Sequence, residues 1–356
     1  MIPPHLPPPT CDIQKHRQWQ RIKILVTATF FGLVAGISGA AVMLGWIWPG
    51  FGEGEVFSST HYSLPNYHTQ LESRVRQEMD ERVVAVYTGS ETNRGIKYLP
   101  RQNFLGNGLL VSSDGWFVIY PGNYSGNYRN WQAVLSDGAI YGVATVLPDK
   151  ISGLVFARLD LTQSATLGRA GLQFKVASFV DNLDLGVDLF VFNGLNWQSA
   201  SEVEEITRPF VSAHLDSAPL KLMSLSSNFL AGAVVVNSQG RAVGLTIGGQ
   251  EFLPYQYITR LLPGVLDQQK IIYASLGVEG WYSAEQPLID AGEKIDGFFV
   301  TKGAGVLRAG DIILELNGQV MNNDNLWLGL KVGDGVRLKV RRAGVDIDLE
   351  STMVGR

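Results

Sequence analysis

Residues 106–124, GNGLLVSSDGWFVIYPGNY, contain the pattern that decides the fold of this chain. Two short apolar runs, 109–111 and 116–119, flank the tripeptide Ser113-Asp114-Gly115. Glycine accepts the positive φ that a tight reversal needs, so the stretch predicts two strands joined by a turn. The pattern indicates a β-rich domain.

The same alternation of short apolar runs and turns continues along the middle of the chain. Turn signals recur at 136–138 and 238–240, and a helical pattern follows at 257–269. Many short strands at this spacing are typical of a β-barrel or sandwich. The apolar runs expected as strands are residues 83–87, 109–111, 116–119, 133–135, 143–147, 154–157, 189–192, 233–236 and 242–247.

Residues 271–356 read as a second, smaller domain. They contain the run RAGDIILELNG at 308–318 and a short apolar segment at 326–330. Little room is left for a helix between Val300 and Asp311, and the helix expected within 322–331 is short. Strands are expected at residues 276–278, 297–301, 336–340 and 345–349.

The N-terminal part predicts a membrane anchor. Residues 24–48 contain no charged side chain, and 25 helical residues exceed the thickness of a bilayer core. Basic residues precede the segment and acidic residues follow it, so residues 1–23, a Pro-rich tail, are expected in the cytoplasm. The alternative is a cleaved signal peptide. Residues 49–80 are expected to be a linker that ends in a short helix, about 70–82.

Composition excludes several classes of protein. The chain has 356 residues, which suggests about two domains, and a net charge of -4 without a basic run, which argues against nucleic-acid binding. Its one cysteine, Cys11, excludes an intramolecular disulfide. No cofactor is expected. His61 and His68 in the linker are a weak metal signal, and no metal site is expected.

Four strings resemble the HtrA/Deg-type trypsin-like serine proteases that carry a C-terminal PDZ domain. The resemblance implies a mainly β fold, with a chymotrypsin-like double β-barrel at 81–270 and a PDZ-like domain at 271–356, behind a single N-terminal transmembrane helix. The strings are GNGLLVSSDGWFVIYPGNY (106–124), VLSDGAIYGVATVLPDKISGLVFARL (134–159), FLAGAVVVNSQGRAVGL (229–245) and FLPYQYITRLLPGVLDQQKIIYASLGV (252–278).

The catalytic positions of that family are empty in this sequence. Aligned without gaps, the histidine position is Gly122, the aspartate position is Gly153 and the serine position is Ala231. A serine protease needs a hydroxyl nucleophile, an imidazole and a carboxylate, and none of these residues supplies one. A shift of register does not restore them, since the nearest hydroxyls, Ser226 and Ser227, come too early. The expected set of catalytic residues is therefore empty.

One histidine remains within the barrel region. His214 lies near Ser212 and Asp216, but residues two apart on a strand do not aim at one another as a catalytic relay requires. A surface or turn histidine is the simpler interpretation. A relocated triad is the rival.

The resemblance also predicts a peptide site in the C-terminal domain. A peptide adds to the sheet edge of a PDZ domain, and backbone N–H groups of the preceding loop hold its terminal carboxylate. By position these are the groups of Leu276, Gly277 and Val278. Two alternatives remain. The groove is shallow, or the domain is a PDZ remnant that only packs on the barrel or on another subunit.

The sequence thus favours a membrane-anchored, catalytically inactive HtrA-like protein. Its barrel and PDZ-like domain are expected outside the cytoplasm, on the periplasmic side of a single-pass membrane protein, where they bind protein C-termini or regulate active relatives in envelope protein quality control. Homo- or hetero-oligomers with HtrA-type subunits are implied by the resemblance. The alternatives are an active endopeptidase with relocated catalytic residues and a purely structural envelope protein.

Overall fold

The computed structural model describes residues 19, 23, 26–29, 67–122, 124, 126–162, 173–181, 188–194, 197–208, 210, 212–290, 292–322 and 324–356. The chain divides into two units, Met1–Pro65 and Asn66–Arg356, and every strand reported below belongs to the second. None of the helices formed by the described residues is long and apolar enough to cross a membrane. The predicted span 24–48 lies, except for residues 26–29, outside them.

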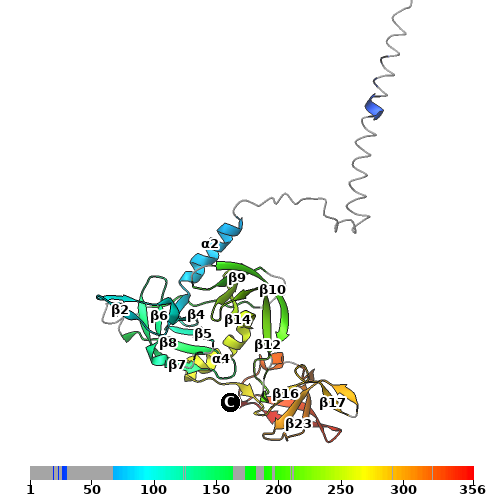
Figure 1. The fold of residues 1–356 in the computed structure, drawn as a ribbon. Coiled ribbons are helices and arrows are strands. Elements are labelled where there is room, and N and C mark those ends of the chain that lie inside the picture. The colour runs from blue at the N-terminus through cyan, green and yellow to red at the C-terminus, as the bar shows by residue number, and fades with distance from the viewer. Residues whose placement is uncertain are drawn as a thin grey trace, which may run out of the picture. The chain divides into compact units, whose positions relative to one another are not determined.

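The first part of the larger unit is a closed antiparallel barrel (Figure 1). Strand β1 closes it by pairing with β4 on one side and β6 on the other. The run at 106–124 forms β4, a tight turn and β5, as its pattern predicts. The barrel strands are β1 (Val83–Tyr87), β4 (Phe104–Leu110), β5 (Trp116–Ile119), β6 (Gln132–Val134), β7 (Ile140–Pro148) and β8 (Val155–Leu159).

A second closed barrel follows, in the order β10-β12-β14-β13-β9. The sequence does not predict β10 or β12, because their residues WQSASEVEEIT and KLMSLSSNF lack an apolar run of the usual kind. Pairing with their neighbours forms both strands nonetheless. The bounds are β9 (Asp188–Phe192), β10 (Trp197–Thr207), β12 (Lys221–Phe229), β13 (Val234–Asn237) and β14 (Ala242–Pro254).

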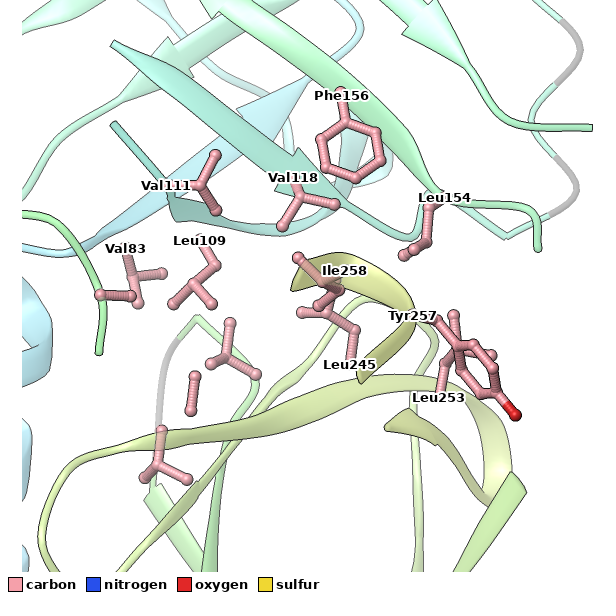
Figure 2. Packing of buried hydrophobic residues seen from close by; sticks show 14 of the residues in the cluster. Val83, Leu109, Val111, Val118, Leu154, Phe156, Leu245, Leu253, Tyr257 and Ile258 are labelled. Carbon is pink, nitrogen blue, oxygen red and sulfur yellow. The ribbon is translucent and has the colours of Figure 1, made fainter. Parts of the chain in front are cut away.

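Two helices pack against a core shared by both barrels. Helix α2 (Tyr67–Asp80) forms where a short helix is expected at the end of the linker, and helix α4 (Tyr255–Gln268) where 257–269 is helical in pattern. Figure 2 shows Ile258 and Tyr257 of α4 among barrel side chains, and Ile258 is fully buried. Burying a side chain of this size stabilises the fold by roughly 1.5 to 3 kcal/mol.

The C-terminal part is an antiparallel sheet in the order β11-β16-β19-β20-β22-β23, with β21 paired to β20. Its edge strand β11 (His214–Leu215) comes from the region between β10 and β12, not from residues 271–356. The other strands are β16 (Glu279–Tyr282), β19 (Phe298–Lys302), β20 (Ile312–Leu316), β21 (Gln319–Val320), β22 (Gly335–Arg342) and β23 (Val345–Thr352).

The strand expected at 276–278 is wrong. Gly277 has a φ of +81°, which breaks an extended run, so the three residues form the loop between β15 (Ala274–Ser275) and β16. The expected short helix within 322–331 is a single 3₁₀ turn, η4 (Asp324–Trp327). The remaining elements are β2 (Glu91–Asn93), β3 (Ile96–Tyr98), η2 (Arg101–Asn103), η3 (Tyr128–Asn130), β17 (Leu288–Asp290), β18 (Glu293–Ile295) and β24 (Val354–Gly355).

Candidate functional site

Two of the three positions that the sequence alignment predicts as catalytic are neighbours in space. Gly122 follows β5 in the first barrel, and Ala231 lies between β12 and β13 in the second. A Cβ atom built on Gly122 would stand 3.7 Å from the Cβ of Ala231, which is ordinary van der Waals contact. The gap-free alignment therefore brings together the residues that the resemblance pairs, and neither residue has a side-chain polar atom.

The third position is filled by an aromatic ring. Gly153 lies in the turn between β7 and β8 with a φ of +86°. A Cβ on this residue would come within 2.8 Å of Cε2 of Tyr120, closer than real Cβ contacts. The space that a carboxylate would need at this position is therefore taken by Tyr120, a residue that the sequence does not single out.

The backbone around Ala231 is held tightly. The Gly232 N–H donates to the Thr246 carbonyl at 2.9 Å, and the Ala233 N–H donates to Thr246 Oγ1 at 2.8 Å. The Gly232 carbonyl accepts from the N–H of Asn107 in the first barrel at 2.7 Å. These bonds fix the turn and join the two barrels at this point.

The residues shortly before Ala231 belong to strand β12. Phe229 ends β12, pairs with Gly249 of β14 and buries its side chain in the second barrel. Ser226 and Ser227 lie in the irregular part of this pairing and are exposed. Neither serine stands at the position of Ala231.

Asp149, whose backbone carbonyl accepts from the Gly153 N–H, is a buried carboxylate with structural partners. Asp149 accepts from the backbone N–H groups of Ile151 at 3.0 Å and Ser152 at 3.2 Å, and from the hydroxyls of Ser152 and Tyr273. Burial, with the Asp149 carboxylate beside it, raises the pKa of the Tyr273 phenol. The sequence does not identify this group, although an aspartate that accepts from the backbone two residues on, as Asp149 does from Ile151, is a common turn signal.

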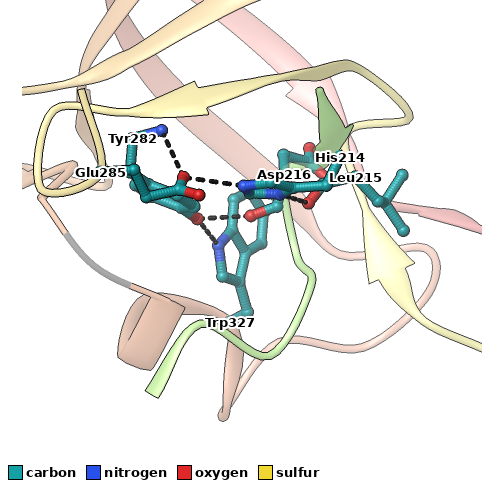
Figure 3. Close-up of polar contacts among 6 residues, drawn as sticks. All are labelled: His214, Leu215, Asp216, Tyr282, Glu285 and Trp327. Atoms are coloured by element: carbon teal, nitrogen blue, oxygen red, sulfur yellow. Dashed lines mark hydrogen bonds and ion pairs between the residues drawn. The ribbon is translucent and has the colours of Figure 1, made fainter. Parts of the chain in front are cut away.

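His214 is not the surface or turn histidine that its sequence neighbours suggest. It is buried in β11, because β11 pairs with β16 and the Phe210 ring lies over the imidazole with centroids 4.2 Å apart. Its Nε2 lies 2.7 Å from Oε2 of Glu285 and its Nδ1 lies 3.0 Å from the Leu215 carbonyl oxygen (Figure 3). Both ring nitrogens therefore have partners other than a hydroxyl, which leaves no nitrogen for the rival triad.

The predicted carboxylate loop, Leu276 to Val278, already contacts a carboxylate. The Leu276 N–H donates to Oδ2 of Asp216 at 2.8 Å, and the Ser275 hydroxyl donates to Oδ1 at 2.5 Å. The Gly277 N–H donates to the Ser275 hydroxyl oxygen at 2.7 Å. Of the three predicted groups, only the Leu276 N–H donates to a carboxylate in this structure, and that carboxylate belongs to Asp216 of the same chain. Binding of a peptide carboxylate by this loop stays a prediction.

No group of three or more His, Cys, Asp and Glu side chains suited to a metal ion occurs among the residues that the structure describes. His61 lies outside those residues, and the side chain of His68 is not among the described ones.

Comparison with known proteins identifies the fold. No family model and no curated protein matches the sequence. Among solved structures, the HtrA-type protease AlgW with a decapeptide is similar at 14% identity and a TM-score of 0.53, over 80% of this chain and 98% of that one. AlgW with a tripeptide is similar at 15% identity and a TM-score of 0.51, over 80% and 97%. The chain has the fold of the HtrA-type serine proteases.

Proposed function

We propose that this protein is a catalytically inactive member of the HtrA type that binds protein chains. The observation that carries the proposal is the contact between Gly122 and Ala231, whose Cβ positions are 3.7 Å apart with no nucleophile or base between them. A histidine and a serine at these positions would be neighbours, as the reaction requires. The two barrels thus hold these positions close together, while the nucleophile and the base that the reaction needs are missing.

The ring of Tyr120 beside Gly153 supports the proposal further. A single substitution at one of the three positions could be compensated by a nearby group. Here the third position is sterically closed, because its Cβ would overlap the ring. The imidazole of His214 is engaged elsewhere, by Glu285 and by a backbone carbonyl. These observations disfavour the alternative of relocated catalytic residues.

Protein binding is the role that remains for such a scaffold. AlgW has been solved with a decapeptide and with a tripeptide. In this chain, the backbone N–H of Leu276, in the loop at 276–278, donates to a carboxylate. We place the barrel and the PDZ-like domain outside the cytoplasm, behind a membrane anchor at 24–48, where they serve as a regulatory or chaperone-like factor in envelope protein quality control. Assembly with HtrA-type subunits belongs to the same proposal.

The inactivity is tested with a serine-reactive fluorophosphonate and an unfolded protein substrate. The full chain is incubated with each, next to an active HtrA-type protease as the positive control. We expect no labelling and no cleavage above the level without protein. Labelling that disappears when one particular serine is replaced, for example in Ser227→Ala, would show a working nucleophile and overturn the proposal.

The placement is tested separately with a reporter enzyme that is active only in an oxidising compartment, fused after Arg356. We expect the reporter to be active and the fusion to sediment with membranes. An inactive reporter on an intact fusion would contradict the orientation, and recovery in the soluble fraction would contradict the anchor.

A further inference from the structure

The chain adds a strand of its own to the edge of the C-terminal sheet. His214 pairs with Gly280 and Leu215 with Glu279, antiparallel to β16. The next residue continues the pattern, since the Asp216 N–H donates to the Val278 carbonyl at 3.1 Å. We call His214 to Asp216 the docked segment. It covers the edge at which a peptide would add as a strand.

The docked segment ends in a carboxylate at the place where a bound peptide would have its own. Asp216 is fully buried and its two oxygens accept from Leu276 and Ser275. A bound C-terminal peptide likewise adds as an extended strand to the sheet edge, and backbone N–H groups hold its terminal carboxylate. In this chain the donors are the Leu276 N–H and the Ser275 hydroxyl. Here the carboxylate is a side chain and the backbone continues through a turn, in which the Ala218 N–H donates to the Leu215 carbonyl at 2.9 Å.

Neighbouring side chains hold the docked segment in place. Figure 3 shows the Asp216 carbonyl accepting from the hydroxyl of Tyr282, which in turn accepts from the indole N–H of Trp327 at 2.6 Å. At the other end of the segment, His214 is bonded to Glu285, which also accepts from the Tyr282 N–H at 3.0 Å. These four bonding groups, the Tyr282 hydroxyl and N–H, the Trp327 indole and the Glu285 carboxylate, all come from the C-terminal sheet and its turns.

Positive charge lies close to the loop as well. A Cβ atom on Gly277 would stand 3.2 Å from Nε and Nη2 of Arg356, so the guanidinium lies directly beside the loop. The Arg260 side chain, on α4, attracts the Asp216 carboxylate. These guanidinium groups favour an anionic group at this position, and they act against the burial of Asp216, which disfavours its charged form.

We propose that the docked segment is an internal ligand that closes a peptide site, and that the site accepts the free C-terminal carboxylate of an extended protein chain once the segment leaves. This inference rests on the proposed protein-binding function and specifies how that binding is controlled. A segment tethered to the same chain competes at a high effective concentration. An external peptide therefore binds more weakly than it would bind an open site. Its apparent Kd is the intrinsic Kd divided by the fraction of molecules in which the site is open.

The docked segment itself supplies the probe for a test. A fluorescent decapeptide with the sequence of residues 207–216, TRPFVSAHLD, carries a free C-terminal carboxylate. Its control has asparagine in the last position and a C-terminal amide, so that it carries neither carboxylate. Binding to the full chain is measured by fluorescence anisotropy for the wild type, Asp216→Ala, Asp216→Asn and Asp267→Asn. The last variant removes an exposed carboxylate near the end of α4 and is the matched control.

We expect Asp216→Ala to bind the free-acid peptide at least tenfold more tightly than the wild type and Asp267→Asn do, and to bind the amidated peptide no better than they do. Asp216→Asn keeps the size of the side chain, so it should fold where the alanine variant does not, and we expect a smaller gain in the same direction. If the wild type and the Asp216 variants bind the free-acid peptide with equal affinity, the docked segment does not close the site. No binding by a folded Asp216 variant would overturn the site.

The result does not depend on the inactivity of the barrel. Fluorophosphonate labelling reports on the barrel alone, and the peptide assay reports on the C-terminal sheet alone. Labelling together with peptide binding by the Asp216 variants would overturn the inactive protease and leave the internal ligand standing. No labelling together with no peptide binding by the folded Asp216 variants would overturn the internal ligand and leave the inactive protease standing.

Discussion

At Gly153 the backbone and a neighbouring ring together exclude a side chain. We expect Gly153→Ala to destabilise the protein by about 2 to 5 kcal/mol, the sum of a left-handed backbone cost and an overpacking cost. Gly122→Ala has only the first cost, about 1 to 2 kcal/mol, because its Cβ would make an ordinary contact with Ala231. The free energies of unfolding in urea measure both.

A double-mutant cycle with Tyr120→Ala separates the two costs. If the ring is the obstacle, Gly153→Ala should cost at least 1 kcal/mol less in the Tyr120→Ala background. Additive effects would show that the ring does not fill the space, and a carboxylate could then be restored at that position. Gly122→Ala should lower the free energy of unfolding by the same amount in the Tyr120→Ala background as in the wild type.

Asp311, in the RAGD run of the C-terminal domain, is stabilised as a carboxylate by an ion pair and a backbone hydrogen bond. Its carboxylate accepts from Nε of Arg342 at 2.8 Å and Nη2 at 2.7 Å, and from the Arg308 N–H at 2.8 Å. The Arg342 guanidinium, followed by the Arg308 N–H, lowers the pKa of Asp311 below its usual value. The stabilising effect is therefore present above about pH 4 and is lost as the pH falls through the lowered pKa.

We expect Asp311→Asn to lower the free energy of unfolding by about 1 to 3 kcal/mol at pH 7. The difference from the wild type should shrink as the pH is lowered from 5 to 2, as urea unfolding at each pH would measure. A difference that stays constant over this range would mean that the carboxylate charge contributes nothing. Asp267→Asn should show no such loss at pH 7.

At the scale of elements, the sequence predicts what is local. Strand β5 forms at its expected residues because WFVI is apolar and is bounded by a Gly turn. Strand β10 was not predictable, since SEVEEIT reads as polar and no apolar run marks it as a strand. The closeness of Gly122 and Ala231 agrees with the matched strings, although the two residues are far apart in sequence. The docking of Asp216 on Leu276 was not predictable, because no local pattern marks a contact across 60 residues.

The docked segment should respond to pH. Burial raises the pKa of Asp216 to about 7, although the hydrogen bonds from Ser275 and Leu276 and the charge of Arg260 act in the opposite direction. The other ionisable groups near the segment are Tyr282 and the buried pair of His214 with Glu285. A raised pKa means that the folded state binds a proton between about pH 4 and 7 that the unfolded state has released. Stability is therefore lost as the pH rises through that range.

We expect the wild type to lose stability relative to Asp216→Asn between pH 5 and 8, by on the order of 2 to 4 kcal/mol. The asparagine variant has no proton to release at this position, so its stability should be flatter over the range. The free-acid peptide should bind the wild type better at pH 8 than at pH 5. A wild-type profile parallel to that of Asp216→Asn would show that this carboxylate does not titrate in the folded protein.

At the scale of the whole Asn66–Arg356 unit, the C-terminal sheet and the barrels share residues and should therefore unfold together. Tyr273 is buried in the barrel core and donates to Asp149, while its backbone N–H and carbonyl pair with Arg356 at 2.8 and 3.0 Å. Leu220, just before β12, is buried in the core of the C-terminal sheet. With the docked segment, these contacts join the two cores within one cooperative unit.

Hydrogen exchange of β13 and β22 in the full chain tests this coupling, because one strand lies in each core. In the wild type we expect the two strands to exchange through the same opening, with equal free energies. The double variant Tyr273→Phe/Asp216→Ala removes the phenol from Asp149 and the carboxylate from Leu276, so exchange of β22 should become faster than exchange of β13 by at least tenfold. Tyr141→Phe changes a buried tyrosine of the first barrel alone, so it should lower the opening free energies of β13 and β22 by the same amount. Different opening energies in the wild type would mean that the C-terminal sheet already opens on its own, and the docked segment would then leave the peptide site without the help of a partner.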